Sequence, residues 1–133
     1  MHGSLDISTS ALVANRTRLD AIAANLAAAQ AGGNPNGPKK PGSLREVIFT
    51  VGDPVSGSEL GVHVSEINEV KAWVPKYEPN SSLADAEGHV WYPDINPVQE
   101  MTNMMSASRS YEANIAAIEA KKSMTSQALE LLA

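Results

Sequence analysis

The side chains that most often carry out chemistry in proteins are few and scattered in this sequence. Its three histidines, His2, His63 and His89, occur in no HxxxH or HxxE pattern, and the chain contains no cysteine. His63 alternates with two valines, which is typical of a strand position that faces solvent or a neighbour. We therefore expect no metal site, and the lack of cysteine excludes disulfide, cysteine-based zinc and iron–sulfur chemistry.

The other candidate groups have simpler structural interpretations. Asp85 and Glu87 precede Gly88, and acidic residues before a glycine favour turns because they accept local hydrogen bonds. The serines within residues 106–110 have no nearby histidine, and the run GGNPNGPKK lacks the GK[ST] ending of a phosphate-binding loop. We expect no catalytic residue, no cofactor-binding residue and no cofactor, so the sequence does not predict an enzyme.

Composition limits the elements that could position any site. The 133 residues include 19 alanines, 16 of them in residues 1–31 or 98–133, whereas all eight prolines lie between Pro35 and Pro97. Because alanine favours helices and proline breaks them, we expect a helical start, a non-helical middle and a helical end. No apolar run reaches the roughly 18 residues of a membrane span. The net charge of −5 and the lack of a basic cluster exclude a typical nucleic-acid binder.

Residues 5–31 have the pattern of a long helix that packs along another helix. Leucine recurs at every seventh position from Leu5 to Leu26, and Ile22 lies between two of these leucines at heptad spacing. The many alanines around this seam would allow a partner helix to approach closely. An ordinary amphipathic core helix is the alternative interpretation of this segment alone.

The last segment begins with clear helix punctuation. Asn96 suits the N-cap, Pro97 the first helical position, and Gln99 the partner position of a capping box. Nothing breaks the helix from there to Ala133. The heptad seam expected along it consists of Met104, Ser108, Tyr111, Ile115, Ile118, Lys122, Thr125, Leu129 and Leu132.

The lengths of these two helices predict an elongated, assembling protein. They would be roughly 40 and 50 Å long, whereas a globular domain of this size has a radius of gyration of roughly 14 Å. Two such helices leave apolar strips uncovered, and exposed apolar strips usually mark interfaces. The candidate assembly interface comprises Leu5, Leu12, Leu19, Ile22, Leu26, Met101, Met104, Met105, Tyr111, Ile115, Ile118, Leu129 and Leu132.

The middle of the chain predicts a small amount of β structure. Residues 31–43 contain four glycines and three prolines, as expected of a turn-rich loop or linker. The runs 44–51 and 62–74 are expected to pair as a hairpin, with Val47, Phe49 and Val51 on one face, and a strand or extended arm is expected at 89–92. So small a β part should pack on the helices or on neighbouring molecules.

Several blocks of the sequence resemble the rod and hook proteins of the bacterial flagellum. The blocks YEP (77–79), YPDIN (92–96), QEM (99–101) and SASRSYEAN (106–114) resemble the C-terminal half of a proximal-rod member of this family. The block IAANLA (22–27) resembles the N-terminal helix shared by the family. The resemblance covers about residues 5–29 and 75–132. Two departures are Ala28, where the family usually has Asn, and His89, where it usually has Tyr. The first would let the helix run on to Ala31.

The resemblance implies a structural role in the flagellar basal body. Members of the family are exported through the flagellar type III apparatus without a cleaved signal peptide, consistent with the N-terminus of this chain. They assemble in the periplasm into the proximal rod, the drive shaft that transmits motor torque. The implied partners are further copies in a helical assembly, other rod subunits, the basal-body ring or bushing, and the export apparatus.

The expected fold is therefore α+β, with the two long terminal helices pairing as an antiparallel coiled-coil-like core and a small β-hairpin or extended segment between them. We divide the chain into 1–31, 32–96 and 97–133, which form one assembly unit. The seam of the first helix should pair with Ile115, Ile118 and Leu129. A helical component or adaptor of another type III secretion system, or a cytoplasmic coiled-coil binding module, is the alternative, although the SASRSYEAN block argues against both.

Overall fold

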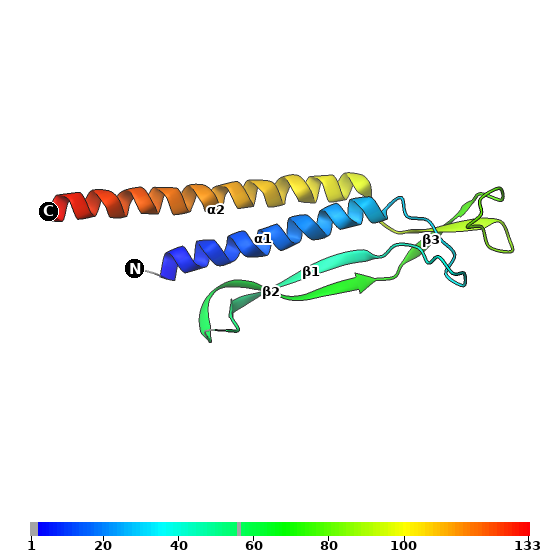
Figure 1. Cartoon of the computed structure of the whole chain (residues 1–133), viewed down its shortest axis with the longest axis horizontal. Coiled ribbons are helices and arrows are strands. Elements are labelled where there is room, and N and C mark those ends of the chain that lie inside the picture. The colour runs from blue at the N-terminus through cyan, green and yellow to red at the C-terminus, as the bar shows by residue number, and fades with distance from the viewer. Residues whose placement is uncertain (1–2, 56) are drawn as a thin grey trace.

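A computed structural model describes residues 3–55 and 57–133 of the chain. Its elements, in order, are α1 (Gly3–Ala28), β1 (Leu44–Asp53), β2 (Ser58–Val70), β3 (Trp73–Tyr77), β4 (His89–Pro93) and α2 (Pro97–Leu132). The two helices lie side by side and run in opposite directions (Figure 1). The α+β class and the two long terminal helices are therefore as predicted.

The β1–β2 hairpin lies along the side of α1 opposite α2, so that α1 is the middle layer of the molecule (Figure 1). The strands pair antiparallel from Leu44 opposite Val70 to Asp53 opposite Ser58. This confirms the predicted hairpin, but its second strand ends at Val70, and residues 73 and 74, expected in the same run, belong to β3 of the other sheet. Both strands contact α1, as expected for a small sheet that is not stable alone.

The residues of β1 that the sequence places on one face are covered unequally. The register shift between Ile48 and Phe49 leaves Ser65 of β2 as the extra residue, so β1 itself continues without an insertion. Val47 is half-buried, but Phe49 is exposed and Val51 is 76% exposed. The three residues expected on one face of β1 are therefore not buried together within the chain.

A second two-stranded sheet lies at the far end of the hairpin, beside the end of α1 and the start of α2 (Figure 1). The expected strand at 89–92 is present as β4, but its partner β3 was not expected from the sequence. Pro75 lies in β3 opposite Trp91, and proline is tolerated there because each strand of a two-stranded sheet has a free edge. The indole of Trp73 donates to the carbonyl of Gly42 at 2.9 Å and so joins β3 to the chain entering β1.

The segment between α1 and β1 is a loop held against β4. The helix ends at Ala28 instead of continuing to Ala31, and the chain turns through residues 29 and 30. Gly33 then exchanges two backbone hydrogen bonds with Trp91, each of 2.9 Å. A Cβ at Gly33 would lie 2.5–2.6 Å from the backbone of residues 39–41, so this close approach requires glycine.

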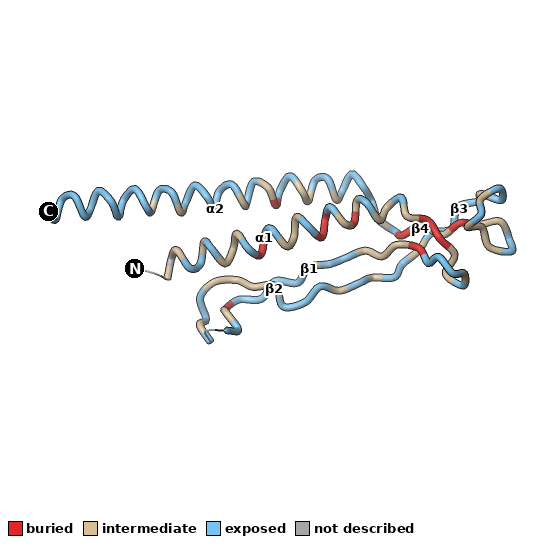
Figure 2. The backbone as a smooth tube through the Cα atoms, in the orientation of Figure 1, coloured by how far each residue is buried: buried red, intermediate tan, exposed pale blue. Residues whose placement is uncertain are grey.

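Few side chains are buried in the chain on its own. Figure 2 shows most of α2 exposed and the buried residues gathered along α1 and at its junction with the sheets. Among the described residues, the buried hydrophobic side chains are Ala14, Ala21, Ile22, Val90 and Ala107. No helix in the described part of the chain is long and apolar enough to cross a membrane.

Candidate assembly interface

The side chains of the predicted α1 seam are all at least half-buried by the rest of the chain. Ile22 is buried, and Leu5, Leu12, Leu19 and Leu26 are half-buried. The alternating seam positions between them are also half-buried, as a heptad stripe facing a partner helix requires. Since α1 contacts α2 along one side and the hairpin along another, this helix is covered on two sides within the chain.

The seam of α2 is rotated from the one predicted. Met104, Tyr111 and Ile118 are half-buried, as expected, but the positions that alternate with them are 107, 114 and 121 rather than 108, 115 and 122. Ala107 is completely buried and Ser108 beside it only half-buried, whereas Ile115 and Lys122 are exposed. The predicted line therefore holds at Ser108 but not at Ile115 and Lys122, and the completely buried position of α2 is the small residue Ala107.

An apolar strip remains exposed beside this seam on the first turns of α2. Met101 and Met105 are 59% and 56% exposed, and Val98 and Ile115 are exposed as well. We call Val98, Met101, Met105 and Ile115 the outer strip. Their spacing places them along one side of a helix, next to the line that faces α1. Met101, Met105 and Ile115 thus belong to surface that the described part of the chain leaves uncovered.

The last part of α2 extends beyond the start of α1 (Figure 1). Leu129 and Leu132 continue the heptad spacing of the seam, but they are 64% and 85% exposed. Leu129 consequently does not pair with the described residues of α1, contrary to its expected pairing with the seam of the first helix. The apolar face of segment 123–133 is left open to solvent by the described residues.

Asn25 is the one buried polar residue among those described, and the sequence analysis did not single it out as an interface residue. The side chain is 2% exposed and joins three elements. Its Nδ2 donates to the backbone oxygen of Arg45 in β1 at 2.9 Å and to Oε2 of Glu100 in α2 at 3.0 Å. Its Oδ1 accepts from the backbone N–H of Arg45 at 2.7 Å. The sequence signal that could have indicated this role is an asparagine directly before Leu26 of the leucine seam.

The start of α2 has the cap that the sequence predicted. The side chain of Asn96 accepts hydrogen bonds from the backbone N–H groups of Val98 and Gln99, at 3.0 and 3.3 Å. Glu100 lies in the first turn, where a carboxylate is favoured by the helix dipole. The same carboxylate accepts from Asn25 and Asn103, so the cap and the contact with α1 lie within one turn of α2.

Near the start of α1, the hydroxyl of Ser10 joins the helix to the β1–β2 hairpin. Ser10 Oγ accepts from the backbone N–H of Val62 at 3.1 Å and donates to the carbonyl of Ile7 at 2.8 Å. Gly61 has a φ of +96°, and a Cβ there would lie 2.8 Å from Ser10 Oγ. A groove of about 720 Å³ remains between this part of α1 and the hairpin.

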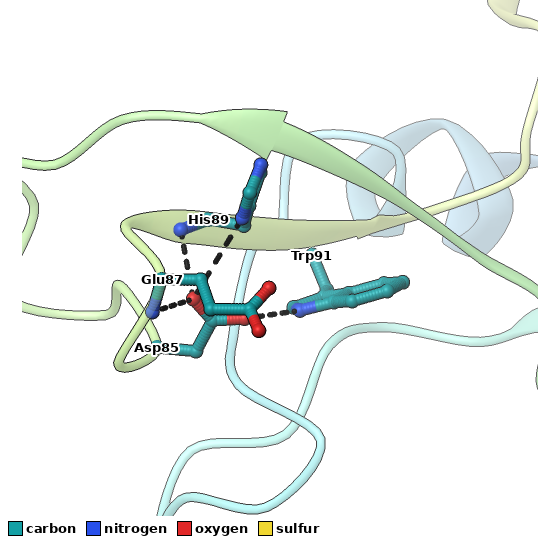
Figure 3. A network of polar contacts seen from close by, with 4 residues as sticks. All are labelled: Asp85, Glu87, His89 and Trp91. Atoms are coloured by element: carbon teal, nitrogen blue, oxygen red, sulfur yellow. Dashed lines mark hydrogen bonds and ion pairs between the residues drawn. The ribbon is translucent and has the colours of Figure 1, made fainter.

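The acidic residues before Gly88 form a turn, as the sequence analysis expected, and Figure 3 shows how Asp85 organises it. One carboxylate oxygen accepts from the backbone N–H groups of Glu87 and His89, each at 2.9 Å, and the other accepts from the indole of Trp91 at 3.0 Å. The N–H of His89 and then the indole of Trp91 lower the pKa of Asp85, because they stabilise its charged form. Asp85 therefore has a structural role.

A surface ion pair lies on the neighbouring strands. Lys76 Nζ is 2.9 Å from Glu78 Oε1, and this contact raises the pKa of Lys76 and lowers that of Glu78. The hydroxyl of Tyr92 donates to Glu78 at 3.2 Å. Burial and the nearby Glu78 carboxylate raise the pKa of Tyr92. The pair is largely exposed, and such pairs contribute little to stability.

The histidines do not gather into a site. His63 is half-buried, with Nδ1 2.7 Å from the carbonyl of Gly52, and the ring of His89 packs edge-on against Tyr77. His2 lies outside the described residues. Within residues 3–55 and 57–133, no group of three or more histidine, aspartate or glutamate side chains could hold a metal ion.

Comparisons with known proteins agree on one kind of relative. A sequence model of the family described as "Flagellar basal body rod FlgEFG protein C-terminal" matches residues 86–131. The chain is 42% identical over 129 residues to the flagellar basal-body rod protein FlgC of Salmonella typhimurium, covering 95% of this chain and 93% of that protein. It is 41% identical to FlgC of Escherichia coli O157:H7 over the same shares. It is 38% identical to FlgC of Aquifex aeolicus, covering 96% of this chain and 93% of that protein.

Proposed function

This chain belongs to the FlgC family of flagellar basal-body rod proteins, and from that premise we propose that it polymerises into the rod by packing of its terminal helices. It is a structural subunit of the basal body. The segments 1–31, 32–96 and 97–133 act as one assembly unit. The alternatives of another type III secretion component or a cytoplasmic binding module are not favoured, because the relatives match nearly the whole chain.

The observation that carries this proposal is the uncovered apolar surface of α2. Eight large hydrophobic side chains of this helix are exposed among the described residues: Val98, Met101, Met105, Ile115, Met124, Leu129, Leu131 and Leu132. Monomeric proteins seldom expose contiguous apolar surface of this kind. Burying one such side chain contributes about 1.5–3 kcal/mol, so a few of them per contact would stabilise a polymer.

In the proposed rod the helices of neighbouring copies cover one another, in a coiled-coil-like arrangement that lines the interior. The contact is heterologous, because a helical polymer requires different surfaces of successive copies to meet. The exposed side chains of the hairpin, Ile48, Phe49, Val51, Leu60 and Ile67, then face outward toward other rod subunits and the ring or bushing. Torque passes through these packed surfaces, since close-packed side chains resist deformation. Export through the type III apparatus delivers the chain to the growing rod.

The test replaces the two exposed methionines of the outer strip. Because Met101 and Met105 are exposed in the single chain, Met101→Asp combined with Met105→Asp should change the free energy of unfolding of the purified chain by no more than about 0.5 kcal/mol per site. In cells that lack the native copy, this variant should restore no swimming, because an aspartate in an apolar contact is unpaired and desolvated. Swimming is measured in soft agar and rod assembly in isolated basal bodies.

The matched control places the same charges elsewhere on the same two turns. Thr102 and Ser106 are exposed, also four residues apart, and lie on another side of α2. Thr102→Asp with Ser106→Asp should swim far better than the methionine variant. Normal swimming and normal rods with the methionine variant would contradict a role for the outer strip in assembly.

A further inference from the structure

Asn25 is a polar residue whose burial costs free energy, and its hydrogen bonds suggest why a polar side chain occupies this position. A buried polar side chain lowers stability relative to an apolar one of similar shape unless every hydrogen bond is made. Here both atoms of the amide are satisfied, by partners from two other elements. No buried side-chain nitrogen or oxygen among the described residues lacks a partner. Buried polar residues of this kind can specify one alignment of otherwise similar helices.

The apolar contacts of α1 leave its alignment ambiguous. Its leucines recur every seven residues, and the half-buried Met104, Tyr111 and Ile118 of α2 recur at the same interval. Sliding one helix by seven residues along the other would therefore bring apolar side chains to equivalent positions again. The 15 residues between α1 and β1 do not prevent such a slide, because a chain of that length can span about 50 Å when extended.

Asn25 removes this ambiguity. If α2 slid by seven residues so that Ala107 replaced Glu100 beside it, the amide would face a methyl group and lose its carboxylate partner. On the other side, both the N–H and the carbonyl of Arg45 point to the same amide. Moving the strand by one residue would turn these groups away, because successive residues of a strand face opposite sides.

We propose that Asn25 is the positioning residue that sets the register of α1 against both β1 and α2. The leucine seam supplies the apolar contact, and the amide selects one alignment among the repeats. Glu100 is its partner on α2, and the backbone of Arg45 is its partner on β1. The register is a property of the single chain, so it is measurable without assembly and can fail independently of the rod function proposed above.

The absence of cysteine allows a direct measurement of the register. A Cβ built at Gly42 lies 3.1 Å from the Cβ of Ala28 and 3.0 Å from the Ala28 carbonyl oxygen, so a shift of a few tenths of an ångström brings the pair to the separation of about 3.5–4.5 Å found in disulfides. Ala28→Cys with Gly42→Cys in the purified full-length chain therefore reports whether the end of α1 meets the chain entering β1. The readout is the rate of disulfide formation under mild oxidation, followed by gel mobility without reductant.

Asn25→Leu in this reporter chain should slow disulfide formation at least tenfold, because the apolar side chain fits several alignments. Asn15→Leu is the matched control. Asn15 is a half-buried asparagine of the α1 seam, but its amide donates to the carbonyl of Ala11 in its own helix at 2.9 Å. The control should stay within twofold of the parent rate. An Asn25→Leu rate within twofold of the parent would overturn the proposal, as would a parent reporter that forms no disulfide.

A charge exchange separates positioning from general packing. Asn25→Asp places two carboxylates against each other and should slow the disulfide at least as much as Asn25→Leu. Combining it with Glu100→Gln restores a hydrogen bond between positions 25 and 100, with the donor now on α2, and the new carboxylate keeps an acceptor for the N–H of Arg45. The carbonyl of Arg45 still loses its donor, so the expected recovery is partial. The double variant should react at least threefold faster than Asn25→Asp alone. No recovery would overturn the proposal, because lost packing by itself predicts none.

Discussion

Asp85 and Asn25 each accept or donate several hydrogen bonds, yet they differ in how far those bonds reach along the chain. All partners of Asp85 lie within six residues, so the acidic pair before Gly88 was enough to predict a turn. The partners of Asn25 are 20 and 75 residues away. A local pattern cannot indicate such a role, because the partners meet only when α1, β1 and α2 pack together.

The turn at Asp85 should loosen in acid. Because its pKa is lower in the folded chain, the unfolded chain binds the proton more readily, and folding is stabilised above the usual aspartate value of about 4. This stabilisation is lost as the pH falls through the lower, folded pKa. The indole N–H resonance of Trp91 should therefore shift as the pH falls below the usual aspartate value of about 4.

Asp85→Asn should abolish most of this pH dependence, because an amide does not titrate. Asparagine also has one side-chain oxygen instead of two, so it cannot accept from the backbone N–H groups and the Trp91 indole together. Asp94→Asn, at an exposed position just after β4 in the sequence, serves as the control and should titrate like the parent chain. A Trp91 resonance that moves equally in the Asp85→Asn chain would show that another group governs the turn.

The two helices differ in how well their predicted seams match the residues that are buried. Every predicted seam position of α1 is buried or half-buried, whereas the seam of α2 is centred on Ala107 and Asn114 instead of Ser108 and Ile115. Both lines fit the heptad spacing, so periodicity alone could not separate them. The structure buries the smaller side chain, Ala107, completely, and a small residue at such a position permits close packing of helices.

Ala107 should tolerate no enlargement. Ala107→Leu adds three carbon atoms to a fully buried position and should lower the free energy of unfolding by about 1–3 kcal/mol. Ala113→Leu makes the same change at an exposed position of α2 and should lie within about 0.5 kcal/mol of the parent. Urea unfolding followed by far-ultraviolet circular dichroism measures both. Equal effects of the two changes would place the seam elsewhere.

The N-cap of α2, Asn96, should contribute to the free energy of unfolding as helix caps usually do. Asn96→Ala removes the oxygen that accepts from Val98 and Gln99 and should lower the unfolding free energy by about 1 kcal/mol. Asn96→Ser keeps an acceptor at this position and should recover most of the loss. Thermal unfolding of the three chains checks the order, and an alanine variant as stable as the parent would mean that the cap contributes nothing measurable.

The whole molecule is a long, thin arrangement with little interior of its own. Its three layers meet along α1, and α2 presents most of its surface to solvent (Figure 2). In the rod proposed above, neighbouring subunits would supply the contacts that the single chain lacks. The low aromatic content and the abundance of alanine are consistent with this, since alanine permits close helix packing but buries little area itself.

The unpartnered end of α2 should therefore matter for assembly and not for folding. Leu129→Asp with Leu132→Asp should leave the stability of the single chain within about 1 kcal/mol of the parent, because both side chains are largely exposed. The same variant should prevent rods from forming in cells that lack the native copy. Rods are counted in isolated basal bodies by electron microscopy.

Ser123→Asp with Ser126→Asp is the matched control, since both serines are exposed and lie three residues apart on the same end of the helix. It experiences the same unfavourable helix dipole as the leucine variant. Rods that form equally well with both variants would remove the end of α2 from the proposed interface.

The elements that could be predicted from the amino-acid sequence are those whose signals are local: both long helices, the Asn96 cap, the β1–β2 hairpin, the strand β4 and the turn at Asp85. These depend on residues a few positions apart, which is the range over which backbone propensity and hydrogen bonding act. The family resemblance depended on the same short blocks, and the comparisons with the relatives confirmed it.

The tertiary structure alone decided which alternatives within those patterns were realised. It placed β3, with its proline, beside β4, ended α1 at Ala28, introduced the register shifts of the hairpin and buried Ala107 in the seam. It also buried Asn25 among three elements. Each outcome depends on contacts between segments far apart in the chain, where packing distance and the need to satisfy buried polar groups outweigh local pattern.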